Sequence, residues 1–394
     1  MKYLFSIILF GFVQFAFAQE DIIDNKAFLL TKFKFELLTG GVIIVHAQIE
    51  NKPDTLNFIF DTGNSGISLD SITASKLNLK VESSNSFIKG ISGIRKAYFI
   101  KNHSLLLPGL KVDNLNFHVS DYELISSTYG ITIHGIIGNS FFRQFIAQID
   151  YDNQEISIYH PGEFNYPTKG FLIKPMFTSY PTYNVSFKEH IKLNVPSIVD
   201  IGAGVNFIAV ASLNKETPYF KKNKKSYETY VGGLGGKKTM QLTVLDKLKF
   251  GPYAFRKVPI LEFEDDFKLL NYPSLGGILG NDLLRRFNLV LNYPSQVIHF
   301  SPNKYFNDYF DYSYTGMSVY LINHLVTIED IIPNSPAEKA GLLSGDILIA
   351  LNGRLVTNLD EYKRIMAMSE GKTKITIFRE GKYYEKKIRI INIK

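Results

Sequence analysis

The sequence contains neither cysteine nor tryptophan. The absence of cysteine excludes a disulfide framework, a thiolate nucleophile and a thiolate metal site. The eight histidines form no H-E-x-x-H pair and no close cluster, so no metal is expected. No G-x-S-x-G motif and no P-loop are present, which argues against α/β-hydrolase and nucleotide chemistry, and we expect no cofactor.

Positive charge is only slightly in excess. Lys plus Arg is 44 and Asp plus Glu is 37, which gives a net charge of +7. The excess is spread thinly, and its densest run, at residues 221–225, has no nucleic-acid motif and no interleaved aromatics. Nucleic acid is therefore not an expected partner. The 394 residues, 45% of them hydrophobic, are enough for two or three globular domains.

The only long apolar run lies at the beginning of the chain. Lys2 precedes an apolar stretch from Tyr3 to Phe17, which closes with Ala16-Phe17-Ala18. This pattern is typical of a signal peptide and is shorter than the roughly 20 residues of a membrane span. We therefore predict a signal peptide over residues 1–18, export of the chain and no membrane span.

A repeat dominates the middle of the sequence. Residues 135–158 align without gaps with residues 277–300, and residues 58–63 match residues 197–202. The identical pairs in the longer alignment are Gly135/Gly277, Ile136/Ile278, Gly138/Gly280, Asn139/Asn281, Arg143/Arg285, Phe145/Phe287, Tyr151/Tyr293, Gln154/Gln296 and Ile156/Ile298. The chain therefore contains two similar lobes in tandem.

Both lobes show the pattern of a mainly β fold. Short apolar or alternating runs punctuated by Gly, Pro and Asn predict strands, for example at residues 41–49, 99–107 and 238–250. Short helices are expected at residues 70–77, 140–145 and 282–287.

A third unit follows the repeat. It is expected to contain strands at residues 317–321, 325–331 and 346–351, a helix after Asn358 with Glu361 in capping-box position, and a closing hairpin that turns at Glu380-Gly381. The predicted division is lobe 1 at 19–165, lobe 2 at 166–301, a connector at 302–313 and a C-terminal domain at 314–394.

The repeat carries one carboxylate in each lobe. Asp61 and Asp200 each end an apolar strand and are followed two residues later by Gly63 and Gly202. Two carboxylates that face each other across a pseudo-twofold axis can share one proton, so that one acts as acid and the other as base. Such a pair can activate water against a peptide carbonyl without a metal or a covalent intermediate. The glycines allow a tight turn beneath the carboxylates.

These residues resemble the aspartic protease superfamily, whose signature tripeptide matches Asp61-Thr62-Gly63. In that family an apolar-apolar-Gly segment braces each active-site turn, as residues 136–138 and 278–280 would do here. The resemblance implies a bilobal double β-barrel and an aspartic-type endopeptidase, with Asp61 and Asp200 as catalytic residues. It also implies that the active-site turns are supported by Thr62, Gly63, Ile201, Gly202, Gly138 and Gly280.

Ile201 departs from the family pattern, which usually has Thr or Ser at this position to bond the opposite loop. Thr62 can still make its half of that exchange. A threonine at 201 would restore the other half, unless Ile201 fills an apolar pocket. A catalytically silent protein that only binds peptides is therefore the alternative.

Two glycine-containing segments, residues 89–93 and 231–236, look like the flap hairpins that close over substrate in retropepsins. The flap glycines are Gly90, Gly93, Gly233 and Gly235. Because each lobe has its own flap, the body resembles a fused retropepsin dimer, and we expect a monomer with two fused lobes.

The C-terminal unit resembles the PDZ domains of bacterial exported proteases, on the basis of residues 335–342, 344–348 and 351–353. That family places its carboxylate-binding loop at Gly316, Met317, Ser318 and Val319, with the helix at 359–368 as the other wall of the groove. The resemblance implies binding of polypeptide substrates or chain ends; a PDZ domain that only packs on the body is the alternative. An exported, cysteine-free chain with such a domain favours the periplasm over extracellular release.

Overall fold

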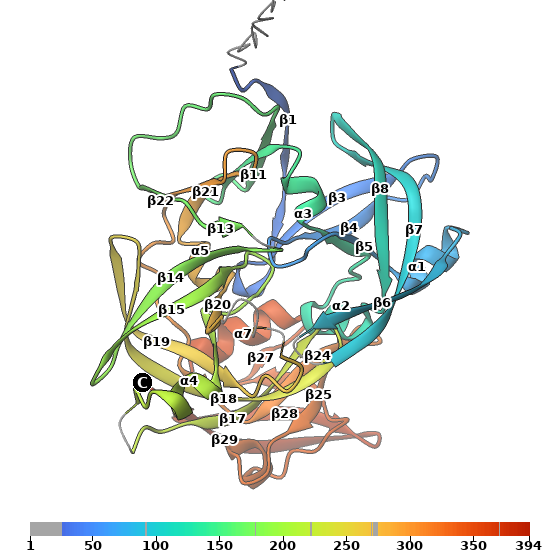
Figure 1. Cartoon of the computed structure of the whole chain (residues 1–394). Coiled ribbons are helices and arrows are strands. Elements are labelled where there is room, and N and C mark those ends of the chain that lie inside the picture. Colours follow the sequence, from blue (N-terminus) through green and yellow to red (C-terminus); the bar gives the residue numbers. More distant parts are fainter. Residues whose placement is uncertain are drawn as a thin grey trace, which may run out of the picture.

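The computed structural model describes residues 26–90, 93–177, 179–220, 223–268, 270, 275–369 and 371–394. The expected signal peptide lies outside these ranges, as do residues 91 and 92 of the first expected flap and residues 221 and 222 of the basic run. The described chain is mainly β, as the sequence predicts, with a few short helices (Figure 1).

The first lobe is built on an eight-stranded sheet. Its strands lie in the order β2 (Glu36–Leu37), β3 (Ile43–Ile49), β4 (Leu56–Phe60), β9 (Gly135–Ile137), β5 (Ile67–Asp70), β8 (Leu110–Ser120), β7 (Gly93–Leu107) and β6 (Glu82–Gly90). The central strands consist mostly of buried apolar residues, as expected for strands covered on both faces.

The second lobe repeats this arrangement. Its strands lie in the order β13 (Met176–Phe177), β14 (Pro181–Lys188), β15 (Lys192–Val199), β20 (Gly277–Leu279), β16 (Phe207–Val210), β19 (Tyr253–Phe263), β18 (Gly236–Phe250) and β17 (Tyr227–Gly233). In each lobe a short strand, β9 or β20, runs parallel to one neighbour and antiparallel to the other. The sequence repeat is therefore also a repeat of topology.

A six-stranded sheet joins the two lobes. Its order is β1 (Leu29–Lys34), β11 (Glu155–Tyr159), β10 (Ile146–Asp150), β21 (Phe287–Asn292), β22 (Val297–Pro302) and β12 (Phe171–Ile173). The duplicated strands β10 and β21 pair antiparallel at its centre, from Ile146 opposite Asn292 to Ile149 opposite Leu289. The largest apolar core runs through both lobes and this sheet, so the lobes form one packed body.

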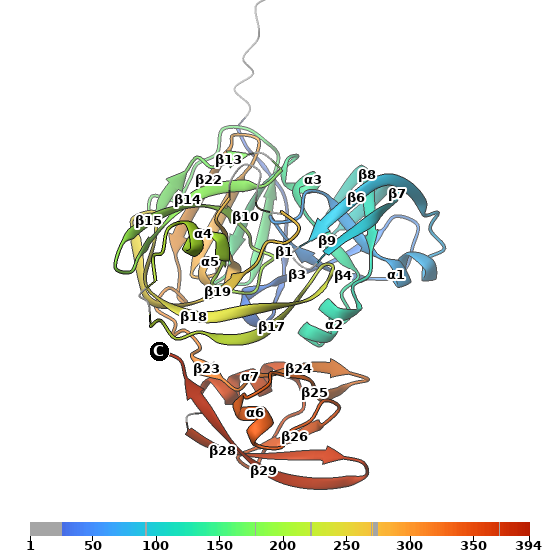
Figure 2. The same cartoon turned by 60° about the horizontal axis from the view of Figure 1, so that its bottom comes forward.

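The C-terminal domain has its own sheet and apolar core, and Figure 2 shows it on one side of the two lobes. The sheet order is β23 (Ser313–Tyr314), β29 (Lys382–Asn392), β28 (Gly371–Arg379), β26 (Ile347–Leu351), β25 (Leu325–Ile331) and β24 (Met317–Ile322), with β27 (Arg354–Leu355) paired to β26. The closing hairpin turns where the sequence predicts, between Arg379 and Lys382.

Half of the described helices form where local signals indicate. The three expected in the lobes are α1 (Ser71–Lys76), α3 (Asn139–Phe142) and α5 (Asn281–Leu284). In the C-terminal domain, α7 (Leu359–Ala367) begins at the expected N-cap, because Glu361 N donates to Asn358 Oδ1 at 2.8 Å. The Glu361 side chain departs from a strict capping box, since its Oε2 accepts from Thr357 N, one residue before the N-cap, at 3.1 Å. The sequence did not indicate η1 (Thr39–Gly41), α2 (Glu123–Tyr129), α4 (Ala211–Glu216) or α6 (Pro336–Lys339).

Candidate active site

The two signature aspartates occupy equivalent loops, each directly after a buried strand. Asp61 follows β4 and donates its backbone N–H to Ile137 O at 2.9 Å. Asp200 follows β15 and donates its backbone N–H to Leu279 O, also at 2.9 Å. Because β9 and β20 are themselves buried, these bonds fix both aspartates relative to the core.

The glycine after each of these short strands lies against the loop that carries the aspartate. A Cβ atom on Gly138 would lie 2.3 Å from Gly66 O and 2.4 Å from Asn64 O. A Cβ atom on Gly280 would lie 2.2 Å from Val205 O and 2.8 Å from Ala203 O. Real Cβ contacts are not this short, so only glycine allows the braces to approach the loops.

The structure brings the two carboxyl groups together. A Cβ atom built on Gly63 would lie 2.3 Å from Asp200 Oδ2, and one built on Gly202 would lie 2.3 Å from Asp61 Oδ1. Each carboxyl therefore lies over the glycine of the opposite loop, and the two carboxyls hydrogen-bond to each other. Gly63 N also donates to Asp61 at 2.6 Å, while Gly202 N and Ala203 N donate to Asp200 at 2.8 and 3.1 Å.

The two carboxyls lie in unequal electrostatic environments. Burial raises the pKa of Asp61 well above its ordinary value, and the neighbouring Asp200 charge and hydrogen bond raise it further, against the Gly63 N–H. Burial also raises the pKa of Asp200, but hydrogen bonds from Asp61, Gly202, Ala203 and Gly63 oppose that rise. More backbone N–H groups bond Asp200 than Asp61, so ionisation is favoured at Asp200, and the two carboxyls titrate as a pair.

Thr62 links the two aspartate-bearing loops from the first lobe. Its fully buried Oγ1 donates to Val199 O at 2.7 Å and accepts from Ile201 N at 3.1 Å. Ile201 offers no hydroxyl in return; its side chain is fully buried and belongs to the main apolar core. The link between the loops therefore rests on one side chain instead of two.

The two expected flaps are hairpins. β6 and β7 pair to their last residues, Gly90 opposite Gly93, and β17 and β18 do the same, Gly233 opposite Gly236. Gly235 lies in the turn of the second hairpin with a φ of 108°, a conformation that L side chains rarely adopt. Each lobe therefore carries a hairpin of similar construction.

The tips of the two hairpins meet. A Cβ atom on Gly90 would lie 2.2 Å from Leu234 O, and one on Gly93 would lie 3.5 Å from Gly235 O. The close approach requires glycine at position 90. With the tips in contact, the hairpins cover the dyad from both lobes.

A cavity of about 460 Å³ lies beneath the hairpins. Asp61 and Asp200 line it together with apolar side chains from both lobes, namely Ile59, Ile136, Ile198, Ile208 and Ile278. The C-terminal domain lines it as well, through Met317, Ser318, Val319 and Tyr320 of β24 and through Tyr362 and Lys363 of α7. The residues predicted for the dyad and for the peptide groove thus share one cavity.

Gly316 directly precedes β24 and has a φ of 72°. A Cβ atom on Gly316 would lie 2.2 Å from Ser335 Cβ. Gly316 does not line the cavity itself. Tyr129 and Lys363 line the cavity, and sequence reasoning missed both. Neither belongs to a recognisable motif: Tyr129 ends α2 of the first lobe, and Lys363 reaches the cavity through the docked C-terminal domain.

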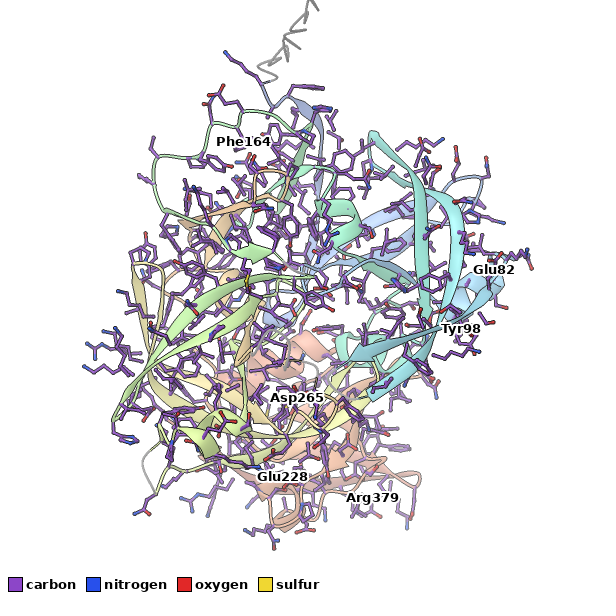
Figure 3. The ribbon with its side chains drawn as sticks, viewed as in Figure 1. Glu82, Tyr98, Phe164, Glu228, Asp265 and Arg379 are labelled. Carbon is purple, nitrogen blue, oxygen red and sulfur yellow. The ribbon has the colours of Figure 1, made fainter. Side chains whose placement is uncertain are left out.

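Contacts between β17–β18 and the C-terminal domain hold that domain against the body. Tyr314 Oη donates to Glu228 O at 2.9 Å, and the rings of Tyr314 and Tyr227 lie 4.8 Å apart. Glu228, on β17, is labelled in Figure 3 on the side of the body that faces this domain. Lys237 Nζ lies 2.9 Å from Asp330 Oδ2. The second hairpin is therefore fixed at several points.

Among the described residues there is neither a metal-binding cluster nor a membrane-spanning helix. Within them, histidine and acidic side chains form no group of three or more that could bind a metal ion. No helix there is both long and apolar enough to cross a membrane.

Comparisons with known proteins match two parts of the chain. Residues 45–141 match the family model for aspartyl proteases, and residues 327–379 match a model for PDZ domains. Among solved structures, the PDZ domain of HtrA3 bound to a phage-derived ligand is similar, with a TM-score of 0.19 and 18% identity, over 20% of this chain and 85% of that one.

Curated relatives share only a short segment with this chain. A probable periplasmic serine protease do/HhoA-like of Haemophilus influenzae is 35% identical over 65 residues, 16% of this chain and 14% of that protein. A probable periplasmic serine endoprotease DegP-like of Marinomonas sp. is 39% identical over 57 residues, 14% of this chain and 12% of that protein. The chain thus spans 14% or less of the length of these two relatives, too little to compare catalytic machinery. By the two family models, the chain contains an aspartyl protease domain followed by a C-terminal PDZ domain.

Proposed function

We propose that the protein is an aspartic endopeptidase that cleaves peptide bonds with a water molecule activated by Asp61 and Asp200. The observation that carries this proposal is the pair of carboxyls, each over the other loop's glycine, inside a cavity closed by two hairpins. Burying carboxyls is costly, so a buried pair that perturbs its own pKa values is typical of a functional site.

The unequal environments of the two carboxyls define the roles of the two groups. Asp200, the ionised member, accepts a proton from water as that water attacks the carbonyl carbon, while Asp61 donates its proton to the carbonyl oxygen. The tetrahedral intermediate then collapses: the carbonyl re-forms, the C–N bond breaks and the leaving nitrogen takes a proton from the pair. As the carbonyl re-forms, a hydroxyl of the intermediate gives its proton to Asp61, and the proton that Asp200 took from water leaves on the amine. The pair thus regains its starting state with one proton, and no metal or covalent intermediate is needed.

The walls of the cavity indicate the type of peptide. The isoleucines that line it from both lobes offer no polar partner to a substrate side chain. We therefore expect apolar residues on both sides of the scissile bond, because their burial provides about 25 cal/mol per Å². The flaps supply backbone groups for an extended chain.

The PDZ domain and the amino-terminal segment complete the proposal. The PDZ domain would bind polypeptide ends at Gly316, Met317, Ser318 and Val319. The expected signal peptide and the periplasmic proteases among the relatives support an exported, periplasmic enzyme. The sheet and core shared by the two lobes support the further proposal of a monomer with two fused lobes.

A peptide-library digestion tests the proposal. The wild-type protein should cleave, and a statine-type transition-state analogue should inhibit it. Asp61→Asn and Asp200→Asn should each be inactive, whereas the exposed Asp54→Asn should match wild type as a control. A folded wild-type protein that binds library peptides but cleaves none would instead identify a catalytically silent peptide-binding protein.

A further inference from the structure

The PDZ domain contributes an unoccupied strand edge to the cavity of the dyad. β24 is the outermost strand of its sheet, and its outer edge pairs with no other described strand. Met317, Ser318 and Val319, at the beginning of this strand, line the cavity together with Asp61 and Asp200. A peptide that pairs with this edge therefore enters the same space as the dyad.

The far end of the groove between β24 and α7 is covered by α2 of the first lobe. Helix α2 packs on β24, and Gly130, directly after it, lies against the groove. A Cβ atom on Gly130 would lie 3.3 Å from Leu359 Cδ1 and 3.6 Å from Leu321 Cβ. A peptide that begins at the start of β24 cannot follow the groove past Leu321. It has to leave the groove within a few residues, on the side of the cavity.

The cavity also contains a cation without an acidic partner. Lys363 Nζ forms no ion pair or hydrogen bond with any described residue, and lies 6.0 Å from the ring centre of Tyr129. Burial lowers the pKa of Lys363, and the charge of Asp360 opposes this. Asp360 is itself engaged, since its Oδ1 accepts a hydrogen bond from Thr39 Oγ1 at 2.5 Å. An anionic group of the ligand would complete this environment.

Tyr129 places Lys363 within a short peptide's length of the dyad. Tyr129 and Lys363 line the same cavity as Asp61 and Asp200, and Tyr129 Oη would lie 2.9 Å from a Cβ atom on Gly204, in the loop that follows Asp200. Burial raises the pKa of Tyr129, and the charges of Asp200 and Asp61 raise it further. Its ring also contacts Lys363. An extended chain covers about 3.3 Å per residue. The cavity volume, about 460 Å³, is in the range that holds a drug-sized ligand, which corresponds to roughly two to four residues.

We propose that this cavity receives the carboxyl-terminal end of a polypeptide. The terminal carboxylate binds near Lys363 and the start of β24, and the bond hydrolysed at Asp61 and Asp200 lies roughly two to four residues upstream. The protein then releases short carboxy-terminal fragments instead of cutting at arbitrary internal sites. This inference rests on the proposed aspartic peptidase activity and assigns its substrate class.

Matched peptides test the inference. One apolar peptide is prepared with a free carboxylate and with a carboxamide, and cleavage is followed by mass spectrometry. We expect kcat/KM to be at least tenfold higher for the free acid, mainly through KM. Residues added at the amino end of the peptide should leave the released fragment unchanged. Replacing the terminal carboxylate with a carboxamide should abolish the fixed cleavage position. Equal cleavage of acid and amide would overturn the inference.

Two neighbouring residues of α7 provide the variants. Lys363→Gln should cleave acid and amide at similar rates, and Lys363→Arg should keep the preference because it keeps the cation. The matched control is Arg364→Gln, because Arg364 is exposed, adjacent in sequence and outside the cavity. A Lys363→Gln variant with an undiminished preference for the acid would refute the role of this lysine.

Binding separates this inference from the proposed activity. In Asp61→Asn, which should not cleave, fluorescence anisotropy should show the labelled acid binding at least tenfold more tightly than the amide. If wild type cleaves neither peptide while this difference persists, the proposed activity fails and the site stands. If wild type cleaves both equally and the variant binds both equally, the activity stands and the site fails.

Discussion

The single hydroxyl that links the loops of Asp61 and Asp200 gives the sharpest test of the site's architecture. Thr62→Val keeps the shape of the side chain but removes the donor to Val199 O and the acceptor for Ile201 N. Nothing else in the described structure replaces these bonds, because Ile201 has no hydroxyl. Both backbone groups would remain in a buried environment without a partner.

The size of the effect follows from these two bonds. A buried hydrogen bond contributes about 0.5 to 1.5 kcal/mol net, and an orphaned buried group costs about 1 to 3 kcal/mol. We therefore expect Thr62→Val to lower the free energy of unfolding by roughly 2 to 4 kcal/mol. Thr62→Ser keeps the hydroxyl and loses one buried methyl, at a cost of about 1 kcal/mol.

Thermal unfolding and peptidase kinetics measure the difference. At roughly 2 to 4 °C per kcal/mol, the valine variant should melt roughly 5 to 15 °C below wild type, and the serine variant only a few degrees below. The kcat of the valine variant should fall at least about tenfold, because small displacements of catalytic groups are costly. A valine variant that melts at or above the serine variant would refute the linking role of Thr62.

The remaining predictions concern the dyad and its surroundings. Asp61→Asn and Asp200→Asn should each reduce kcat by at least about 10³-fold, with unchanged circular dichroism, because one ionisable member cannot exchange acid and base roles. Because the pKa of Asp61 is raised in the folded state, stability should be greatest below its ordinary value near 4 and fall as the pH rises through the folded pKa. Melting curves between pH 4 and 8 should therefore show a smaller decline for Asp61→Asn than for wild type. Ile201→Thr should destabilise by about 1 to 3 kcal/mol in denaturant titrations, since the hydroxyl would enter the apolar core; unchanged or increased stability would show that the hydroxyl finds a partner. Lys237→Met should raise KM by loosening the second hairpin from Asp330, and an unchanged KM would show that the ion pair does not control the flap.

The sequence predicted the parts of the site that local patterns determine. The duplicated Asp-x-Gly and apolar-apolar-Gly segments predicted both loops and both braces, because strand, turn and glycine requirements are local. The missing hydroxyl at position 201 predicted a one-sided link. The structure adds the direction of each hydrogen bond and the unequal donors at the two carboxyls, which depend on the exact approach of the loops.

The sequence could not predict how the PDZ domain meets the body. Helix α2 has a sequence rich in Ser, Thr and Ile, which favours other conformations, and it ends at Gly130 with a φ of 75°. Its contact with β24 brings Lys363 to the cavity that Tyr129 and the dyad line. These residues carry no motif, since their importance comes from tertiary contacts between segments more than 200 residues apart.

The protein is asymmetric because a single PDZ domain is attached to two lobes that are related by a pseudo-twofold axis. A cleft with exact twofold symmetry would accept a peptide equally well in both directions, because each carboxyl could be acid or base. Here Asp200 receives more backbone N–H groups than Asp61, so the roles differ before substrate binds. The single PDZ domain lies on one side of the cleft and brings one cation, Lys363, to that side alone. A chain whose carboxylate binds there can lie in only one direction. The PDZ domain would therefore orient the peptide, and the unequal dyad would use that orientation to decide which carboxyl protonates the carbonyl oxygen.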